Sequence, residues 1–199
     1  MEDMELKEGK LAVQLARKTV ENFVSGKEIP KTEKLPEVFS ENLGAFVSLH
    51  TYPKKELRGC IGYPEPVYPL WKALTECAVH ACQDPRFRPV QKSELPKIIV
   101  EVSILTKPEL IECSPKEYPK HVKIGEDGLI IRKGWSSGLL LPQVATDHKF
   151  SAKEFLEHTC MKAGLSPDSW LDQNCRIYKF QAEIFGEKTP GGEIEKVKT

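Results

Sequence analysis

The segment LRGCIGY at residues 57–63 brings a thiol, a guanidinium group and two glycines close together in the chain. If the segment is a strand, Arg58, Cys60 and Gly62 lie on one face, because alternate residues of a strand point the same way. A cation beside a thiol lowers the pKa of the thiol, and glycines within a strand let another group approach the backbone. The segment therefore favours a nucleophile or a ligand pocket. The alternative is a small, inert, buried cysteine in a strand whose glycines admit a helix.

A charged loop, DPRFRP at residues 84–89, follows the predicted helix over residues 69–83. The prolines can hold Arg86 in a fixed place, where its guanidinium group could bind a carboxylate or a phosphate through two hydrogen bonds. Arg86 could equally pair with Asp84 and fix the loop beneath a docked Phe87. Both interpretations stay open on the sequence alone, and both make Asp84 and Arg86 candidate site residues.

A further candidate is Gln143, which lies in the segment LPQV at the end of a predicted strand. His148 follows it and could serve Cys60 as a general base, although the sequence does not bring the two residues together. His50 lies in a predicted strand and could face either way. An enzyme would therefore use Cys60 as its catalytic residue and would still lack an identified base.

Composition and motifs argue against several classes of function. Lysine plus arginine equal aspartate plus glutamate at 29 each, so no overall field attracts the chain to nucleic acid. Walker, GxGxxG, HExxH and GxSxG motifs are absent from the sequence. The six cysteines form no CxxC and no zinc-type cluster with histidine. We therefore expect free thiols and predict no metal and no cofactor.

One local surface could still suit single-stranded nucleic acid. Lys54, Lys55 and Arg58 lie near Tyr52 and Tyr63 in the sequence, and such proteins combine basic residues with aromatic ones. A solvated hairpin tip explains the same residues equally well.

The chain has no segment that predicts a membrane span or an export signal. Its longest apolar runs are only a few residues, far below the roughly 20 that cross a bilayer. The first ten residues, MEDMELKEGK, mix acids and bases and lack the apolar stretch of a signal peptide. We therefore expect a soluble, intracellular protein of the cytoplasm, with no membrane partner.

The elements that must position the candidate residues follow from the spacing of apolar side chains. Helical spacing predicts helices over residues 9–25 and 69–83, the first of which ends at Gly26. Alternating and β-branched runs predict strands at residues 45–52, 57–63, 97–106 and 176–185. Since strands and helices do not alternate regularly, an antiparallel α+β fold is expected.

Two hairpins, one helix start and a tail complete this outline. The first two strands are joined through PKKE, and residues 121–125 and 128–133 flank Glu126-Asp127 as a second, glycine-rich hairpin. The segment WSSG and another strand, through Leu139 to Leu141, are expected to follow it. Ser151 and Glu154 have the spacing of a capping box that opens a helix. Residues 187–199 are polar and are predicted to be a mobile tail.

Five short segments, in this order and at this spacing, resemble the AMMECR-one family, named for the human chromosomal region linked to Alport syndrome, midface hypoplasia and elliptocytosis. The segments are LRGCIG at 57–62, DPRF at 84–87, SELP at 93–96, VSIL at 102–105 and LPQVA at 141–145. The resemblance covers nearly the whole chain and implies a single AMMECR-one-like domain over residues 1–199. It also implies an α+β fold, with a mainly antiparallel sheet flanked by helices and a cleft between a larger and a smaller lobe.

The resemblance implies no established activity and no substrate. Prokaryotic relatives are associated with Memo-like and radical SAM proteins, which makes such proteins possible partners. We expect a protein that binds a small anionic or peptide ligand in a cleft lined by LRGCIG, through Arg58, Gly59, Gly62, Asp84, Arg86 and Gln143. Two alternatives stay open: an enzyme with Cys60 as an activated thiol, and a nucleic-acid-binding or protein-scaffold module.

Overall fold

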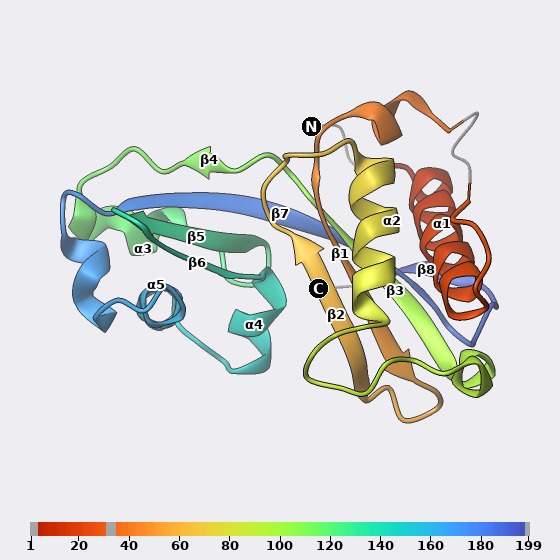
Figure 1. Ribbon diagram of the computed structural model, residues 1–199. Coiled ribbons are helices and arrows are strands. Elements are labelled where there is room, and N and C mark those ends of the chain that lie inside the picture. The colour runs from red at the N-terminus through yellow and green to blue at the C-terminus, as the bar shows by residue number, and fades with distance from the viewer. Residues whose placement is uncertain (1–3, 31–34, 198–199) are drawn as a thin grey trace. The chain divides into compact units, whose positions relative to one another are not determined.

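An antiparallel sheet organises this protein, as a computed structural model describing residues 4–30 and 35–197 shows (Figure 1). Six strands follow one another in the order β2-β1-β3-β7-β5-β6, and β4 and β8 each pair with β7. The predicted α+β class, with a mainly antiparallel sheet flanked by helices, is confirmed. The strands are Gly44–Thr51 (β1), Leu57–Tyr63 (β2), Ile98–Leu105 (β3), Glu109–Leu110 (β4), Asp127–Lys133 (β5), Ser136–Leu140 (β6), Arg176–Glu187 (β7) and Ile194–Val197 (β8).

The chain divides into two compact units, and strand β7 contributes residues to both. Of the described residues, unit 1 contains those up to 105 and those from 183 to 197, and unit 2 contains residues 106–182. Each unit has its own cluster of buried apolar side chains. The single domain, and the two lobes with a cleft between them, stay predictions.

Helices accompany the strands of both units. In unit 1 they are α1 (Leu6–Val24), η1 (Glu37–Ser40), α2 (Leu70–Ala81) and η2 (Lys92–Lys97). In unit 2 they are η3 (Pro115–Glu117), α3 (Tyr118–His121), α4 (Pro142–Asp147), α5 (Ala152–Lys162) and η4 (Pro167–Leu171). Among the described residues, no helix combines the length and the apolar character that crossing a membrane requires.

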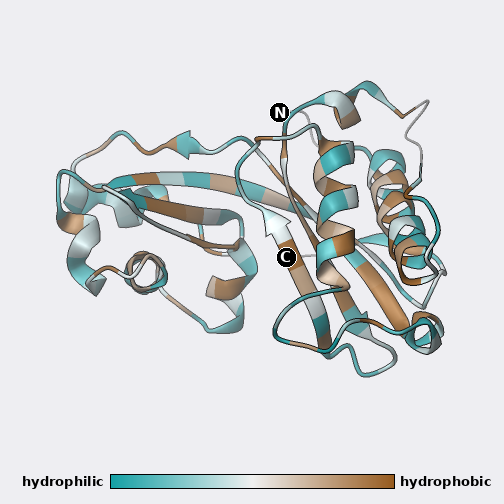
Figure 2. Ribbon diagram, viewed as in Figure 1, coloured by the Kyte–Doolittle hydropathy of each residue, from teal (hydrophilic) through white to brown (hydrophobic). Residues whose placement is uncertain are grey.

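Helices α1 and α2 pack against each other and against the strands of unit 1. Their buried residues recur at helical spacing, as Ala12, Ala16 and Val20 do in α1. Figure 2 shows apolar and polar residues interspersed along both helices, as one-sided burial requires. Helix α1 stops at the predicted place, because Gly26 takes the left-handed conformation at φ 69° and its amide donates to the carbonyl oxygen of Phe23.

The core of unit 2 lies between β5, β7 and helix α5. Leu129 and Ile131 of β5 are fully buried in one cluster with Phe155 of α5. The end of α5 also lies close to β6, since a Cβ at Gly138 would come within 2.4 Å of the backbone nitrogen of Ala163. Glycine at this position therefore lets helix and strand approach each other.

The second hairpin differs from the predicted one. Strands β5 and β6 are joined through Gly134 and Trp135, with Gly134 at φ 59°, and β6 begins within the WSSG segment, earlier than the predicted strand at Leu139. A strand over residues 121–125 is wrong, because α3 ends at His121 and the chain then turns. The Asp127 carboxylate accepts a hydrogen bond from the Lys123 amide at 2.9 Å, which closes that turn.

The predicted polar tail contains a strand that the sequence analysis missed. Strand β8 pairs with the end of β7, from Ile184 opposite Val197 to Glu187 opposite Ile194. Lys188 forms ion pairs with Glu193 at 3.0 Å and with Glu195 at 3.3 Å. Mobility of the tail stays a prediction, and residues 198–199 lie outside the described part of the chain.

Candidate functional site

The β1–β2 hairpin positions the LRGCIGY segment, and packing explains both of its glycines. A Cβ at Gly59 would lie 2.2 Å from the carbonyl oxygen of Ala81, where α2 ends. Gly62 is the cross-strand neighbour of Phe46, and a Cβ there would lie 2.1 Å from the Phe46 ring. Any larger residue would push the helix or the ring away. Both glycines thus have a structural reason, which is the alternative that the sequence left open.

Arg58 is held by an acid on η2 and is not the cation beside Cys60. Its Nε and Nη2 donate to the two carboxylate oxygens of Glu94, at 2.8 and 3.1 Å, and Nη2 also donates to the carbonyl oxygen of Arg88. The pair lowers the pKa of the Glu94 carboxyl group. The Arg58 side chain is only 13% exposed. The cation that acts to lower the pKa of the Cys60 thiol is Arg86, so the effect predicted for Arg58 is wrong.

Asp84 and Arg86 connect their loop to the backbone of β2 through hydrogen bonds. Arg86 donates from Nε and Nη2 to the two carboxylate oxygens of Asp84, at 3.0 and 2.6 Å. Asp84 also accepts the Cys60 amide at 2.9 Å, while Arg86 Nη2 reaches the Cys60 carbonyl oxygen at 3.2 Å. These donors hold the pKa of the Asp84 carboxyl group, which is 2% exposed, far below its usual range. The ion pair between Arg86 and Asp84, one of the two interpretations that the sequence left open, is present.

Cys60 lies opposite Ser48 of β1, and burial dominates its chemistry. The Ser48 hydroxyl donates to the Cys60 sulfur at 3.1 Å. Burial raises the pKa of the Cys60 thiol above its ordinary value of 9.0, although Ser48 and Arg86 each act to lower it. The neutral thiol is therefore the main form at pH 7, contrary to the activated thiolate that the sequence suggested.

His50 faces the same side of the sheet as Cys60, which the sequence could not decide. Glu101 of β3 is the neighbour of Ser48 across the strands, and its Oε1 lies 3.8 Å from His50 Nε2. His50 Nε2 is buried and forms no hydrogen bond within the described part of the chain. A thiol, a hydroxyl, an imidazole and a carboxylate thus share one face of three neighbouring strands.

A pocket of about 450 Å³ opens beside Arg58 and not around Cys60. The one cation on its wall without an acidic partner is Arg88, whose exposed side chain forms no ion pair with the residues that the structure describes. Sequence reasoning passed over Arg88 and Glu94, although both lie in the quoted motifs. No pattern in the sequence marks these two residues, because their parts follow from the pairing of Arg58 and Arg86 with acids in the fold. The lining residues are Arg58, Phe87, Arg88, Pro89, Gln91 and Glu94.

Gln143 and His148 belong to unit 2, so the structure does not place them with Cys60. Gln143 lies in the first turn of α4, and its side-chain oxygen is buried without a hydrogen-bond partner among the described residues. The His148 ring stacks on Phe150 with the ring centres 5.2 Å apart. Their predicted parts in binding and in base catalysis stay predictions.

Metal and nucleic-acid sites gain no support from the geometry. In residues 4–30 and 35–197, no three histidine, cysteine, aspartate or glutamate side chains are grouped to hold a metal ion. At the hairpin tip, Lys54 lies 4.0 Å from Glu56, and both side chains are largely exposed. The basic and aromatic surface predicted there therefore has the form of a solvated turn.

Comparison with known proteins places the chain among close relatives. The model of the AMMECR1 family matches residues 13–185. Protein MJ0810 of Methanocaldococcus jannaschii is 54% identical over 191 residues, which are 95% of this chain and 94% of the relative. Protein PF1979 of Pyrococcus furiosus is 49% identical over 94% of this chain and 92% of its own length.

A solved structure shows the same fold. The crystal structure of the uncharacterized protein PH0010 from Pyrococcus horikoshii superposes with a TM-score of 0.91 at 46% identity, covering 98% of this chain and 99% of that one. The resemblance drawn from the five sequence segments is confirmed.

Proposed function

The chain belongs to the AMMECR1 family, and from this premise we propose that it binds a small anionic ligand in the pocket beside its LRGCIGY segment. The names of these relatives state no activity, and the residues of the site itself support the proposal. The observation that carries the proposal is that two of three neighbouring arginines form ion pairs and the third forms none among the described residues. Arg58 pairs with Glu94 and Arg86 with Asp84, whereas the positive charge of Arg88, which lines the pocket, has no acidic partner among the described residues.

The charges of the pocket select an anion. Arg58 and Glu94 cancel each other within the wall, which leaves the guanidinium group of Arg88 as the uncompensated charge. Guanidinium groups bind carboxylates and phosphates through two parallel hydrogen bonds. The exposed position of Arg88 means that a ligand gains this interaction without first breaking an ion pair within the described residues.

An aromatic ring gives the same pocket a second feature. Phe87 lines it, with the guanidinium carbons of Arg58 and Arg86 at 6.0 and 5.6 Å from the ring centre. The two cations hold the ring in place, since such contacts are attractive. A ligand that joins an anionic group to a flat or apolar part, such as an aryl phosphate or the carboxylate end of a peptide, would use both Arg88 and Phe87.

A titration followed by amide NMR signals tests this proposal, with phenyl phosphate as the probe. We expect the largest shifts at Phe87, Arg88 and Gln91, because these residues line the pocket. Benzylamine, which keeps the ring and reverses the charge, is the matched control and should leave these signals in place. Equal shifts with both probes, or shifts confined to other residues, would rule the anion pocket out.

A thiol enzyme is the second candidate, and one observation favours it. Ser48 donates to the Cys60 sulfur, and His50 with Glu101 lies on the same face of the sheet, which makes His50 the candidate base for such an enzyme. Burial acts against it, because it keeps the thiol protonated. We therefore rank binding first.

A further inference from the structure

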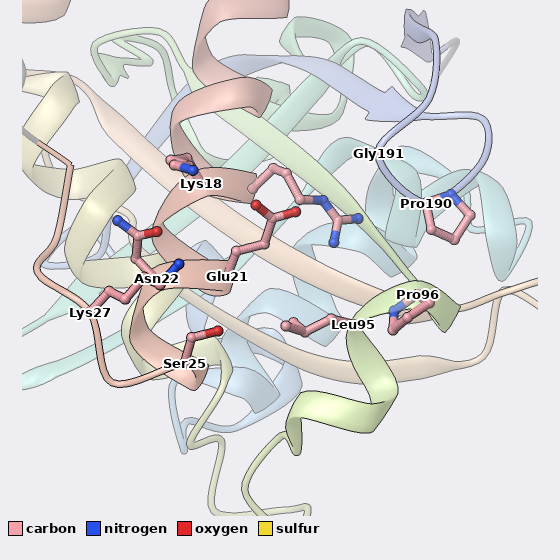
Figure 3. Close-up of a pocket in the computed structure, with 10 residues that line it drawn as sticks. Lys18, Glu21, Asn22, Ser25, Lys27, Leu95, Pro96, Pro190 and Gly191 are labelled. Carbon is pink, nitrogen blue, oxygen red and sulfur yellow. The ribbon is translucent and has the colours of Figure 1, made fainter.

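A second hollow in unit 1 lies between the C-terminal half of α1, helix η2 and the turn between β7 and β8 (Figure 3). Its volume is about 410 Å³, within the range of small-molecule sites. Figure 3 shows Leu95 and Pro96 of η2 across from the α1 residues, with Pro190 and Gly191 on the turn. None of its lining residues belongs to the LRGCIGY segment or to the pocket beside Arg58.

The wall of this hollow includes a buried arginine with a free donor group. Arg17 binds Glu187 side-on, through Nε and Nη2, and Nη2 also donates to the carbonyl oxygen of Ile98. No described residue accepts the hydrogens of Nη1, although the Arg17 side chain is only 9% exposed. A guanidinium group has five N–H donors in a fixed plane, so the free edge at Nη1 suits a carboxylate oxygen.

Three further charges line the hollow without ion pairs among the described residues. Lys18 and Lys27 carry positive charges, and Glu21 lies on α1 one turn after Lys18. Glu21 is half-buried, whereas both lysines are exposed. An anion alone would meet Arg17 and the lysines but would leave Glu21 uncompensated. A ligand with a carboxylate and an ammonium group meets all of these charges.

The opposite side of the hollow is apolar. Leu95, Pro96 and Pro190 contribute hydrocarbon surface there, and none of them offers a side-chain hydrogen bond. We propose that this hollow binds a free α-amino acid with an aliphatic side chain: the carboxylate at Arg17, the ammonium group at Glu21 and the side chain against Leu95. The volume accommodates such a ligand together with water.

The probe for this site is L-leucine, followed by amide NMR signals. We expect shifts at Glu21, Asn22, Ser25, Lys27, Leu95 and Gly191, because these residues line the hollow. Two fragments of leucine test the charges one at a time. 4-Methylpentanoate lacks the ammonium group, 3-methylbutylamine lacks the carboxylate, and each should bind more weakly than leucine itself.

Glu21→Gln tests the ammonium contact without disturbing an ion pair within the described residues. We expect it to weaken leucine binding about fivefold, as for one partly exposed charge pair, and to leave 4-methylpentanoate unaffected. Glu112→Gln makes the same charge change at an exposed position of unit 2 and should change nothing. The proposal fails if leucine shifts none of these signals, or if 4-methylpentanoate binds as tightly as leucine.

Discussion

At the scale of single residues, two side chains that are close in sequence need not interact in the fold. Arg58 and Cys60 are two residues apart, yet Arg58 binds Glu94, and the cation that acts on the thiol is Arg86. Desolvation outweighs that cation because the sulfur is largely out of water. A thiol of this kind is protonated at neutral pH, and nucleophilic attack requires the thiolate.

Alkylation of Cys60 by iodoacetamide should therefore be slow at pH 7. Its rate should rise with pH and still be rising above pH 9, because the pKa of this thiol lies above 9.0. Mass spectrometry of the alkylated peptides measures the rate at Cys60 against half-buried Cys113 in the same sample. Fast, selective modification of Cys60 with an apparent pKa below 8 would revive the activated thiol and the enzyme candidate.

At the scale of elements, the charged loop at residues 84–89 stabilises strand β2 through hydrogen bonds. Asp84 joins the loop to the strand through the Cys60 amide and the Arg86 side chain. Since the Asp84 carboxylate is buried and all of these donors favour its charged form, its removal should loosen the loop.

Asp84→Asn should lower the free energy of unfolding by about 2 kcal/mol at pH 7, as expected for losing charged hydrogen bonds. The folded pKa of Asp84 lies below its unfolded value of 3.8, so the charged group stabilises the fold above pH 3.8. That contribution is lost as the pH falls further, through the folded pKa. Urea unfolding at pH 7, 5, 4 and 3 measures it. A difference between wild type and variant that grows as the pH falls would contradict this role.

Most elements could be predicted because their signals are local. The stripe of α1, its stop at Gly26 and the capping box at Ser151 each lie within a few residues of one another, and all three are present. The strand over residues 121–125 was predicted in error because an aspartate followed by a glycine gives the sequence signal of a hairpin turn. Strand β8 was missed because its polar residues form a strand only by pairing with β7.

At the scale of the molecule, the site could be predicted only in part. The segments LRGCIGY and DPRFRP, which the sequence singled out, both contribute residues to the wall of the pocket. Which arginine is free depends on Glu94 and Asp84, and the Arg58–Glu94 partners are 36 residues apart. Spacing in sequence cannot report such pairs, because the fold brings them together. Gln143 belongs to unit 2 and Cys60 to unit 1.

In the proposed binding site, the three arginines at positions 58, 86 and 88 have different roles. Arg58 and Arg86 stabilise the β2 region through acids, and Arg88 is the residue that we propose binds the ligand. A substitution at Arg88 should therefore change affinity and leave the fold intact. Arg176 offers a matched control, because it is exposed in unit 2 and forms no ion pair with described residues.

The most direct test is the dissociation constant of phenyl phosphate for the wild type, Arg88→Met and Arg176→Met, measured by calorimetry. The account predicts about tenfold weaker binding for Arg88→Met, the loss expected for a hydrogen-bonded charge pair. Arg176→Met should bind like the wild type, and all three proteins should unfold at the same urea concentration. Unchanged affinity in Arg88→Met would contradict the account and remove the pocket as the ligand site.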